Sequence, residues 1–233
     1  MAARLRLLGS AWQPLLARAV DALAAGGLDL GGLWPSPELR RASLERLGQL
    51  LDRVVTWNAR MDLTAARDER ELVDLFLADA LVLAAAGAQS DAEGAARWVD
   101  VGSGAGAPGL SLALLRPGPA MTLVEPRQKR VAFLRSVAGS FGETAGVRVV
   151  EGRSDGVPTA DHEIAVSRAT FSPEQWLAEG ARLARREVWV LLARAEAPAL
   201  AGWQPTRQID YDWPLTGVAH RAVAFSPADA PRA

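Results

Sequence analysis

The sequence predicts an α/β protein in which a doubly wound, mostly parallel sheet of seven strands follows an N-terminal helical extension. Before residue 90, apolar residues recur at spacings of three and four, which is typical of amphipathic helices. From Arg97 onward, short apolar runs alternate with helical segments, which favours a parallel sheet covered by helices on both faces. One apolar run ends in a glycine-rich turn, and a new helical segment follows it directly.

The first 90 residues are expected to form helices over 15–25, 38–57 and 69–86. Ser36 followed by Pro37 is a typical helix start, with the serine as the cap, and Asp68 is expected to open the third helix. Glycines and prolines between the first two helices indicate a loop. We therefore expect residues 1–90 to be a helical region packed on the core, and residues 91–233 to be the ligand-binding domain.

The rest of the chain is expected to hold five parallel strands, at 98–101, 121–124, 147–150, 164–167 and 188–192, with helices at 108–115, 128–141 and 173–185. Two further strands, 208–212 and 221–225, are expected to form an antiparallel edge. Ligands of such sheets bind beyond the carboxyl ends of the strands. Four polar residues fall at these ends: Asp100, Glu125, Glu151 and Arg168.

The glycine turn is compatible with two kinds of cofactor. Residues 104–109 match the G-x-G-x-x-G pattern of dinucleotide-binding proteins, and Glu125 lies about 20 residues further on, where such proteins bind ribose hydroxyls. Asp100 would repel a pyrophosphate, whereas it can pair with the amino group of a sulfonium cofactor such as S-adenosylmethionine. The acid therefore favours S-adenosylmethionine over NAD. A phosphate-binding P-loop is excluded, because the chain has no Gly-Lys-Ser/Thr triplet.

Composition excludes several other classes of site. A formal net charge of -1 gives no general attraction to nucleic acid, so any RNA contact must come from a local patch. The chain has no cysteine, and its two histidines, His162 and His220, lie far apart, so no metal site is expected. No apolar run approaches the ~20 residues of a membrane span, and a cytoplasmic protein is expected.

Several short motifs stand in an order that is typical of one known family. They are Trp57-Asn58, Leu63-Thr64, Asp79, the run from Asp100 to Gly106, Pro108-Gly109, Lys129-Arg130-Val131, Phe133-Leu134-Arg135, Arg153 and Ser167-Arg168-Ala169. Together they resemble the bacterial small-subunit (16S) rRNA guanine-N7 methyltransferases of the glucose-inhibited-division-B type, over roughly residues 57–194. The resemblance implies a Rossmann-like methyltransferase domain, S-adenosylmethionine as cofactor, and 16S rRNA or the small ribosomal subunit as partner. We expect a monomer.

The resemblance also implies roles for individual residues on the cofactor side. Gly102 and Ala107 would line the methionine and ribose side, Ser154 and Asp155 would lie near the adenine, and Arg168 would lie close to both cofactor and substrate. With the acids and glycines above, the expected cofactor site comprises Asp100, Gly102, Gly104, Gly106, Ala107, Glu125, Ser154, Asp155 and Arg168. No residue is assigned a catalytic role, because guanine N7 already presents a lone pair and needs no general base.

The expected substrate-binding residues are Asn58, Lys129, Arg130, Arg153 and Arg194. The surrounding stretch also holds other basic residues, and arginines beside one helix can contact phosphates and stack on unpaired bases. For each of them, a solvated helix face is the alternative interpretation. Asn58 can also simply cap a turn.

The chain departs from the family pattern mainly on the RNA side. Asp62 replaces an asparagine, Phe76 replaces a histidine, Arg194 aligns with a lysine, and His220 precedes Arg221 where the family has the reverse order. These departures leave open a cofactor-binding pseudoenzyme or a methyltransferase for another substrate. The glycine pattern leaves open an NAD-dependent oxidoreductase. Trp57 and Phe76 are otherwise expected in the core, and Asp79 is either an exposed acid or a buried polar contact.

Overall fold

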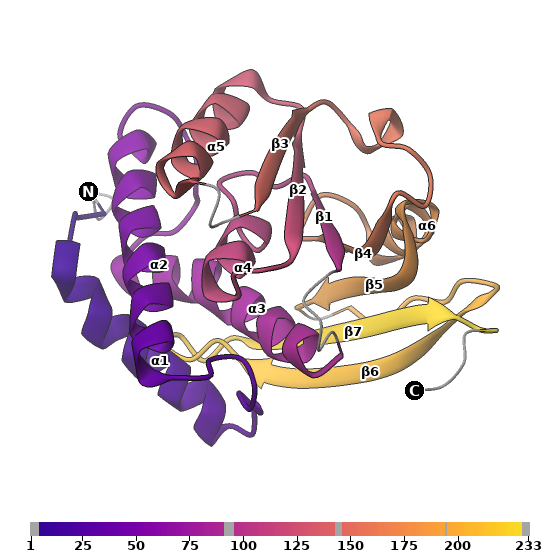
Figure 1. Cartoon of the computed structure of the whole chain (residues 1–233), viewed down its shortest axis with the longest axis horizontal. Helices are drawn as coiled ribbons and strands as arrows, with labels where there is room; N and C mark the ends of the chain where they lie inside the picture. Colours follow the sequence, from indigo (N-terminus) through magenta and orange to yellow (C-terminus); the bar gives the residue numbers. More distant parts are fainter. Residues whose placement is uncertain (1–4, 91–95, 143–145, 194, 230–233) are drawn as a thin grey trace.

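A seven-stranded sheet forms the centre of the molecule. The computed structural model describes residues 5–90, 96–142, 146–193 and 195–229. The strand order is β3-β2-β1-β4-β5-β7-β6 (Figure 1). The first five strands pair in parallel, and β7 and β6 add an antiparallel edge. The predicted fold class is confirmed.

Each predicted strand is present, with ends that extend a few residues further. The strands are β1 (Arg97–Val101), β2 (Ala120–Glu125), β3 (Val147–Glu151), β4 (His162–Ser167), β5 (Ala184–Leu192), β6 (Trp203–Asp212) and β7 (Ala219–Pro227). Several predicted helix ends differ by one to four residues, and the helix expected to reach Arg185 ends at Leu183. Ala184 is extended and buried, and it pairs with His162 of β4, so sheet pairing overrides the helical pattern here.

The helices follow the predicted order. They are α1 (Trp12–Ala25), α2 (Pro37–Asn58), α3 (Glu69–Ser90), α4 (Gly109–Leu115), α5 (Gln128–Ser140) and α6 (Pro173–Leu183), with short 3-10 turns η1 (Gly9–Ala11) and η3 (Ser154–Gly156). The predicted starts are confirmed: the Ser36 hydroxyl accepts from the amide of Leu39, and Asp68 Oδ1 accepts from the amides of Arg70 and Glu71. Within the described ranges, no helix is long and apolar enough to cross a membrane.

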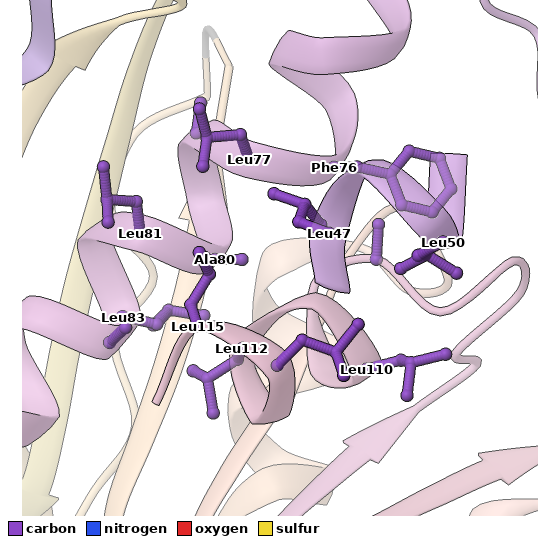
Figure 2. Packing of buried hydrophobic residues seen from close by; sticks show 14 of the residues in the cluster. Leu47, Leu50, Phe76, Leu77, Ala80, Leu81, Leu83, Leu110, Leu112 and Leu115 are labelled. Atoms are coloured by element: carbon purple, nitrogen blue, oxygen red, sulfur yellow. The ribbon is translucent and has the colours of Figure 1, made fainter. Parts of the chain in front are cut away.

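The N-terminal helices and the sheet share one hydrophobic core. Figure 2 shows side chains of α2, α3 and α4 converging, among them Leu47, Leu50, Phe76, Leu77, Leu81, Leu110, Leu112 and Leu115. Each is fully or almost fully buried, and burying one such side chain stabilises the fold by about 1.5–3 kcal/mol. This packing fixes α3, and the loop before it, beside the helix that follows the glycine turn.

The two faces of β1 show how the strand directs its residues. Val99 and Val101 belong to the smaller core cluster, which also contains Trp176 and Leu177 of α6. Asp100 lies between them in the strand and therefore faces the opposite side, where its carboxylate contacts the start of α4. Strand alternation thus places one acid beneath the glycine turn.

Candidate cofactor-binding site

The turn after β1 is built from glycines with left-handed backbone angles. Gly102, Gly104 and Gly106 have φ values of +73°, +57° and +96°. The amides of Gly102 and Ser103 both donate to the carbonyl of Val124, at 2.8 and 3.2 Å, which ties the turn to β2. A Cβ on Gly102 would stand 2.1 Å from the Thr170 hydroxyl oxygen. The turn therefore requires glycine for its conformation and for the close approach of neighbouring groups.

Glu125, the last residue of β2, binds the backbone of the glycine turn through its carboxylate. Its Oε2 accepts from the amide of Gly104 and its Oε1 from the amide of Arg127, both at 2.9 Å. The side chain is buried. A carboxylate has about four acceptor positions, and these two bonds leave lone pairs for further donors. The acid predicted to bind ribose thus also shapes the turn itself.

Asp100 is a buried acid with one oxygen committed to the backbone. Its Oδ2 accepts from the amide of Gly109 at 3.0 Å, and its Oδ1 has no hydrogen-bond partner within the described residues. Burial raises the pKa of Asp100 to about 6, although the Gly109 amide and the charge of Arg168 act in the opposite direction. A cation placed near Oδ1 would compensate the buried carboxylate.

A cavity of about 750 Å³ opens at the carboxyl edge of the parallel strands. Three segments line it: the glycine turn with the end of β4, the loop before α3 together with α3 itself, and the connection between β6 and β7. The lining residues that matter most here are Gly102, Ser103, Gly104, Ala105, Ala107, Arg168, Thr170, Leu63, Arg67, Phe76, Arg130, Trp213, Thr216 and Val218. The volume lies within the range typical of small-molecule sites. Of the predicted cofactor residues, Gly102, Gly104, Ala107 and Arg168 line this cavity, whereas Asp100 and Glu125 are not among its lining residues.

Asn58 shapes one wall of this cavity from outside. Its side-chain oxygen accepts from the amides of Leu63 and Thr64, at 2.8 and 3.1 Å, and so closes the loop that follows α2. This is the turn-capping role that the sequence left open. Asp62, in the same loop, is exposed.

Asp79 of α3 joins two walls of the cavity. The side chain is 1% exposed, so the structure places it in a buried polar contact. Its Oδ2 lies 3.3 Å from Nη1 of Arg168, while its Oδ1 accepts from the Tyr211 hydroxyl at 2.8 Å and from the Trp213 indole at 3.3 Å. Arg168 also donates to the carbonyl of Leu75 at 2.6 Å. One carboxylate thereby fixes an arginine and an aromatic ring that both face the cavity.

Asp74, one turn earlier on α3, fixes the β6–β7 connection. It accepts hydrogen bonds from the amides of Leu215 and Thr216 and from the Thr216 hydroxyl. Burial raises the pKa of Asp74 despite these bonds. The role of Asp74 was not predicted, because an acid on a helix gives no local sign of a partner about 140 positions away.

The remaining predicted cofactor residues are distributed along the same sheet edge. Ala107 lines the cavity, whereas Gly106 packs against Leu110, where a Cβ would come within 2.8 Å. Ser154 and Asp155 form η3 just after β3 and do not line the cavity as the described residues define it. Their predicted place beside the adenine stays a prediction.

The predicted RNA-contacting residues differ in exposure. Arg130 is half-buried and lines the cavity, whereas Lys129 and Arg153 are exposed. Arg135, on the same helix, lies 3.7 Å from Glu151. Arg194 lies outside the described residues.

Trp213 also lines the cavity, a role that was not predicted from the sequence. The indole stacks on His220, with ring centroids 4.5 Å apart and an interplanar angle of 8°. The available signal was the Trp213-Pro214 pair between two predicted strands, an aromatic residue at a turn that brings it back to the sheet edge.

A second cavity, of about 770 Å³, lies between the α1 end, α3 and β6. Gly27, Gln89, Arg207 and His220 are among its lining residues, and Trp213 borders both cavities. Its lining does not include the turn after β1. The first cavity is therefore the candidate cofactor site.

The chain is similar to known proteins in sequence and in fold. A family model described as rRNA small subunit methyltransferase G matches residues 43–204. A protein of Anaeromyxobacter dehalogenans (strain 2CP-1) named ribosomal RNA small subunit methyltransferase G is 38% identical over 162 residues, which are 68% of this chain and 70% of that protein. A protein of the same name from Myxococcus xanthus is 35% identical over 166 residues, covering 70% of this chain and 71% of its own length. The solved structure of magnesium protoporphyrin IX methyltransferase from Synechocystis PCC 6803 with bound SAH has a similar fold, with a TM-score of 0.54 at 13% identity over 76% of this chain and 93% of that one.

Proposed function

The chain belongs to the rRNA small subunit methyltransferase G family, and on this premise we propose that it methylates N7 of a guanine in 16S rRNA, using S-adenosylmethionine. The observation that carries the proposal is the cavity in which the glycine turn, Arg168 and Trp213 meet. Family membership and the methyltransferase fold remove the reason to consider an NAD-dependent oxidoreductase.

The residues present fit the cofactor. S-adenosylmethionine supplies a methyl group activated by a positively charged sulfur. The buried Oδ1 of Asp100 suits its amino group, and the spare lone pairs of Glu125 suit ribose hydroxyls. The turn presents backbone at Gly102 and Gly104, where a side chain would occupy space or strain the conformation. Ser154 and Asp155 are proposed to lie near the adenine.

The reaction depends on positioning the methyl donor and the guanine more than on proton transfer. The N7 lone pair forms the new bond to carbon as the electron pair of the old bond moves to sulfur, and the purine gains the positive charge. Holding the two reactants in line can supply about 7–11 kcal/mol of a barrier. The walls fixed by Asp79, Asp74 and Glu125 are proposed to provide this order.

Phe76 is compatible with this chemistry. It borders the cavity, yet its side chain is fully buried and belongs to the main core cluster. Because N7 needs no base, the loss of a histidine here removes no proton acceptor that the reaction requires. The departure at position 76 therefore gives no ground for proposing an inactive protein.

Recognition of RNA is proposed to rest on a local basic surface beside the cavity. Arg130 lines the cavity, and Lys129, Arg135 and Arg153 expose their charges nearby in sequence. Such residues contact phosphates, and they act locally in a chain whose net charge is -1. Residues 1–90 are proposed to add the wall formed by residues 63–67 and the start of α3.

Mass mapping of 16S rRNA tests the proposed function. A strain lacking this gene is expected to lose one N7-methylguanine, which the wild-type chain restores and the Gly102→Ala variant does not. Calorimetry on the purified protein is expected to show binding of S-adenosylmethionine and none of NAD. An unchanged guanine methylation pattern in the deletion strain would contradict the 16S assignment.

A further inference from the structure

Trp213 presents an aromatic ring to the cofactor cavity. Two aromatic residues line this cavity within the described chain, Phe76 and Trp213. Phe76 is fully buried in the core, whereas Trp213 is half-buried. Trp213 is therefore the aromatic residue with surface left for a ligand.

The indole is held on one face and at its edge. His220 stacks on it at 4.5 Å and 8°, and Tyr211 lies 5.9 Å from His220 with an angle of 26°. The indole nitrogen donates to Asp79 Oδ1 at 3.3 Å. His220 lines the second cavity and not the first, while Trp213 borders both. Trp213 thus lies between the two cavities, and His220, which lines the second cavity, stacks on its ring.

The carboxylate of Asp79 positions both the Trp213 ring and the neighbouring Arg168. Asp79 binds Trp213 through Oδ1 and Arg168 through Oδ2, and both partners line the cavity that contains the glycine turn. Val218 and Arg67, at 44% and 83% exposure, mark where this cavity meets solvent. A ligand entering there reaches the ring and the cofactor turn within one enclosure.

We propose that Trp213 is the stacking platform for the acceptor guanine, an inference that rests on the proposed function. Unpaired RNA bases are commonly bound by stacking on aromatic side chains. Methylation at N7 makes the purine a cation, and an aromatic face attracts a cation. Burial lowers the pKa of His220, which favours the uncharged form of the ring stacked on the indole. The platform therefore binds the acceptor more strongly as positive charge develops on it.

Single-turnover methyl transfer to small subunits from the deletion strain tests the platform. Trp213→Leu is expected to lower the transfer rate at saturating RNA about ten- to a hundredfold, and Trp213→Phe to retain most of it. Calorimetry should give both variants the wild-type affinity for S-adenosylhomocysteine. Trp34→Leu is the matched control, because Trp34 is also half-buried but bonds to the carbonyl of Leu115 outside the cavity.

The outcomes separate this inference from the proposed function. If the wild-type chain transfers methyl groups and Trp213→Leu does so at the same rate, the stacking platform is overturned and the proposed function stands. Loss of S-adenosylhomocysteine affinity in Trp213→Phe also overturns it, since the ring would then belong to the cofactor. Absence of transfer by the wild-type chain overturns the proposed function itself. If Trp213→Leu fails to fold, the affinities of the protein for 7-methylguanosine monophosphate and for guanosine monophosphate are compared instead. The platform is supported if the wild-type chain and Trp213→Phe prefer the methylated nucleotide and Trp213→His shows a weaker preference. It is overturned if the wild-type chain shows no preference.

Discussion

Two walls of the same cavity are built in different ways. The wall formed by the glycine turn is held by the backbone: amides of Gly102, Gly104 and Gly109 bond to a carbonyl and two buried acids. A second wall, formed by Arg168 just after β4 and Trp213 in the β6–β7 connection, is held by side-chain contacts that converge on Asp79. A backbone wall suits a cofactor that is the same molecule in every reaction cycle. A side-chain wall can be altered by single substitutions, which suits the part of the site that selects an acceptor.

The backbone wall is expected to break most completely at Gly102. Gly102→Ala places a Cβ about where the Thr170 side chain stands, at a φ of +73° that side chains rarely adopt. We expect loss of S-adenosylmethionine affinity of about a hundredfold or more, measured by calorimetry, because the turn must move out of place. Gly118→Ala is the control: its φ is +132°, and nothing lies within 4 Å of its Cβ. Equal affinity in Gly102→Ala and wild type would contradict the assignment of the turn.

The side-chain wall is expected to fail as a unit at Asp79. Asp79→Asn leaves Arg168 without its buried counter-charge and lowers the free energy of unfolding by about 3 kcal/mol. Urea denaturation measures the change. Asp161→Asn removes an acid that is 44% exposed and lies 3.4 Å from Arg97, and its effect should stay below about 1 kcal/mol. If the two variants lose equal stability, the network at Asp79 does not hold the wall.

A smaller effect is expected in the pH dependence of S-adenosylmethionine binding, through Asp100 of the backbone wall. Asp100 has a pKa near 6 in the free protein, and a bound ammonium favours its charged form. Affinity for S-adenosylmethionine should therefore be constant above pH 6 and fall as the pH drops below it, by about tenfold at pH 5. Asp100→Asn should remove this dependence. Glu187→Gln, which replaces a half-buried acid whose pKa burial also raises, should keep this dependence. A flat wild-type profile would show that Asp100 does not bind the amine.

The smallest expected effect lies outside both walls, on the exposed charges of α5. Lys129→Gln should reduce the slope of the logarithm of RNA affinity against the logarithm of salt concentration by about 0.7, the value for one contact with single-stranded phosphate. Filter binding at several salt concentrations measures the slope. Arg41→Gln, which changes a 74% exposed arginine on α2, is the matched control. Equal slopes in the two variants would indicate that Lys129 does not contact RNA phosphate and belongs to a solvated helix face.

Most of the backbone wall could be predicted because its glycines and one of its acids are contiguous in sequence, and the remaining contacts come from the end of the next strand along the chain, at Val124 and Glu125. Asp100, the glycines and the start of α4 lie within ten residues, and strand alternation alone orients the acid. The helix starts at Ser36 and Asp68 were readable for the same reason. Asn58 was placed correctly only as a turn cap, and its predicted contact with substrate stays untested.

The side-chain wall could not be predicted, because its contacts join distant parts of the chain. Asp79 meets Arg168 across 89 positions and Trp213 across 134. These meetings depend on β7 pairing with β5 and on β6 forming the edge, which no local pattern specifies. The adjacent residues Lys129 and Arg130 illustrate the same limit of prediction from sequence. Arg130 lines the cavity and Lys129 does not, and only the orientation of α5 in the folded protein determines which of them does.

A crystal structure with S-adenosylhomocysteine would show which groups of the protein hold the cofactor. We expect the ligand in the 750 Å³ cavity, with its amine near Asp100 Oδ1, its ribose near Glu125 and its sulfur open toward Trp213. A ligand lying in the second cavity, or one that leaves the turn from Gly102 to Ala107 without contact, would contradict this expectation.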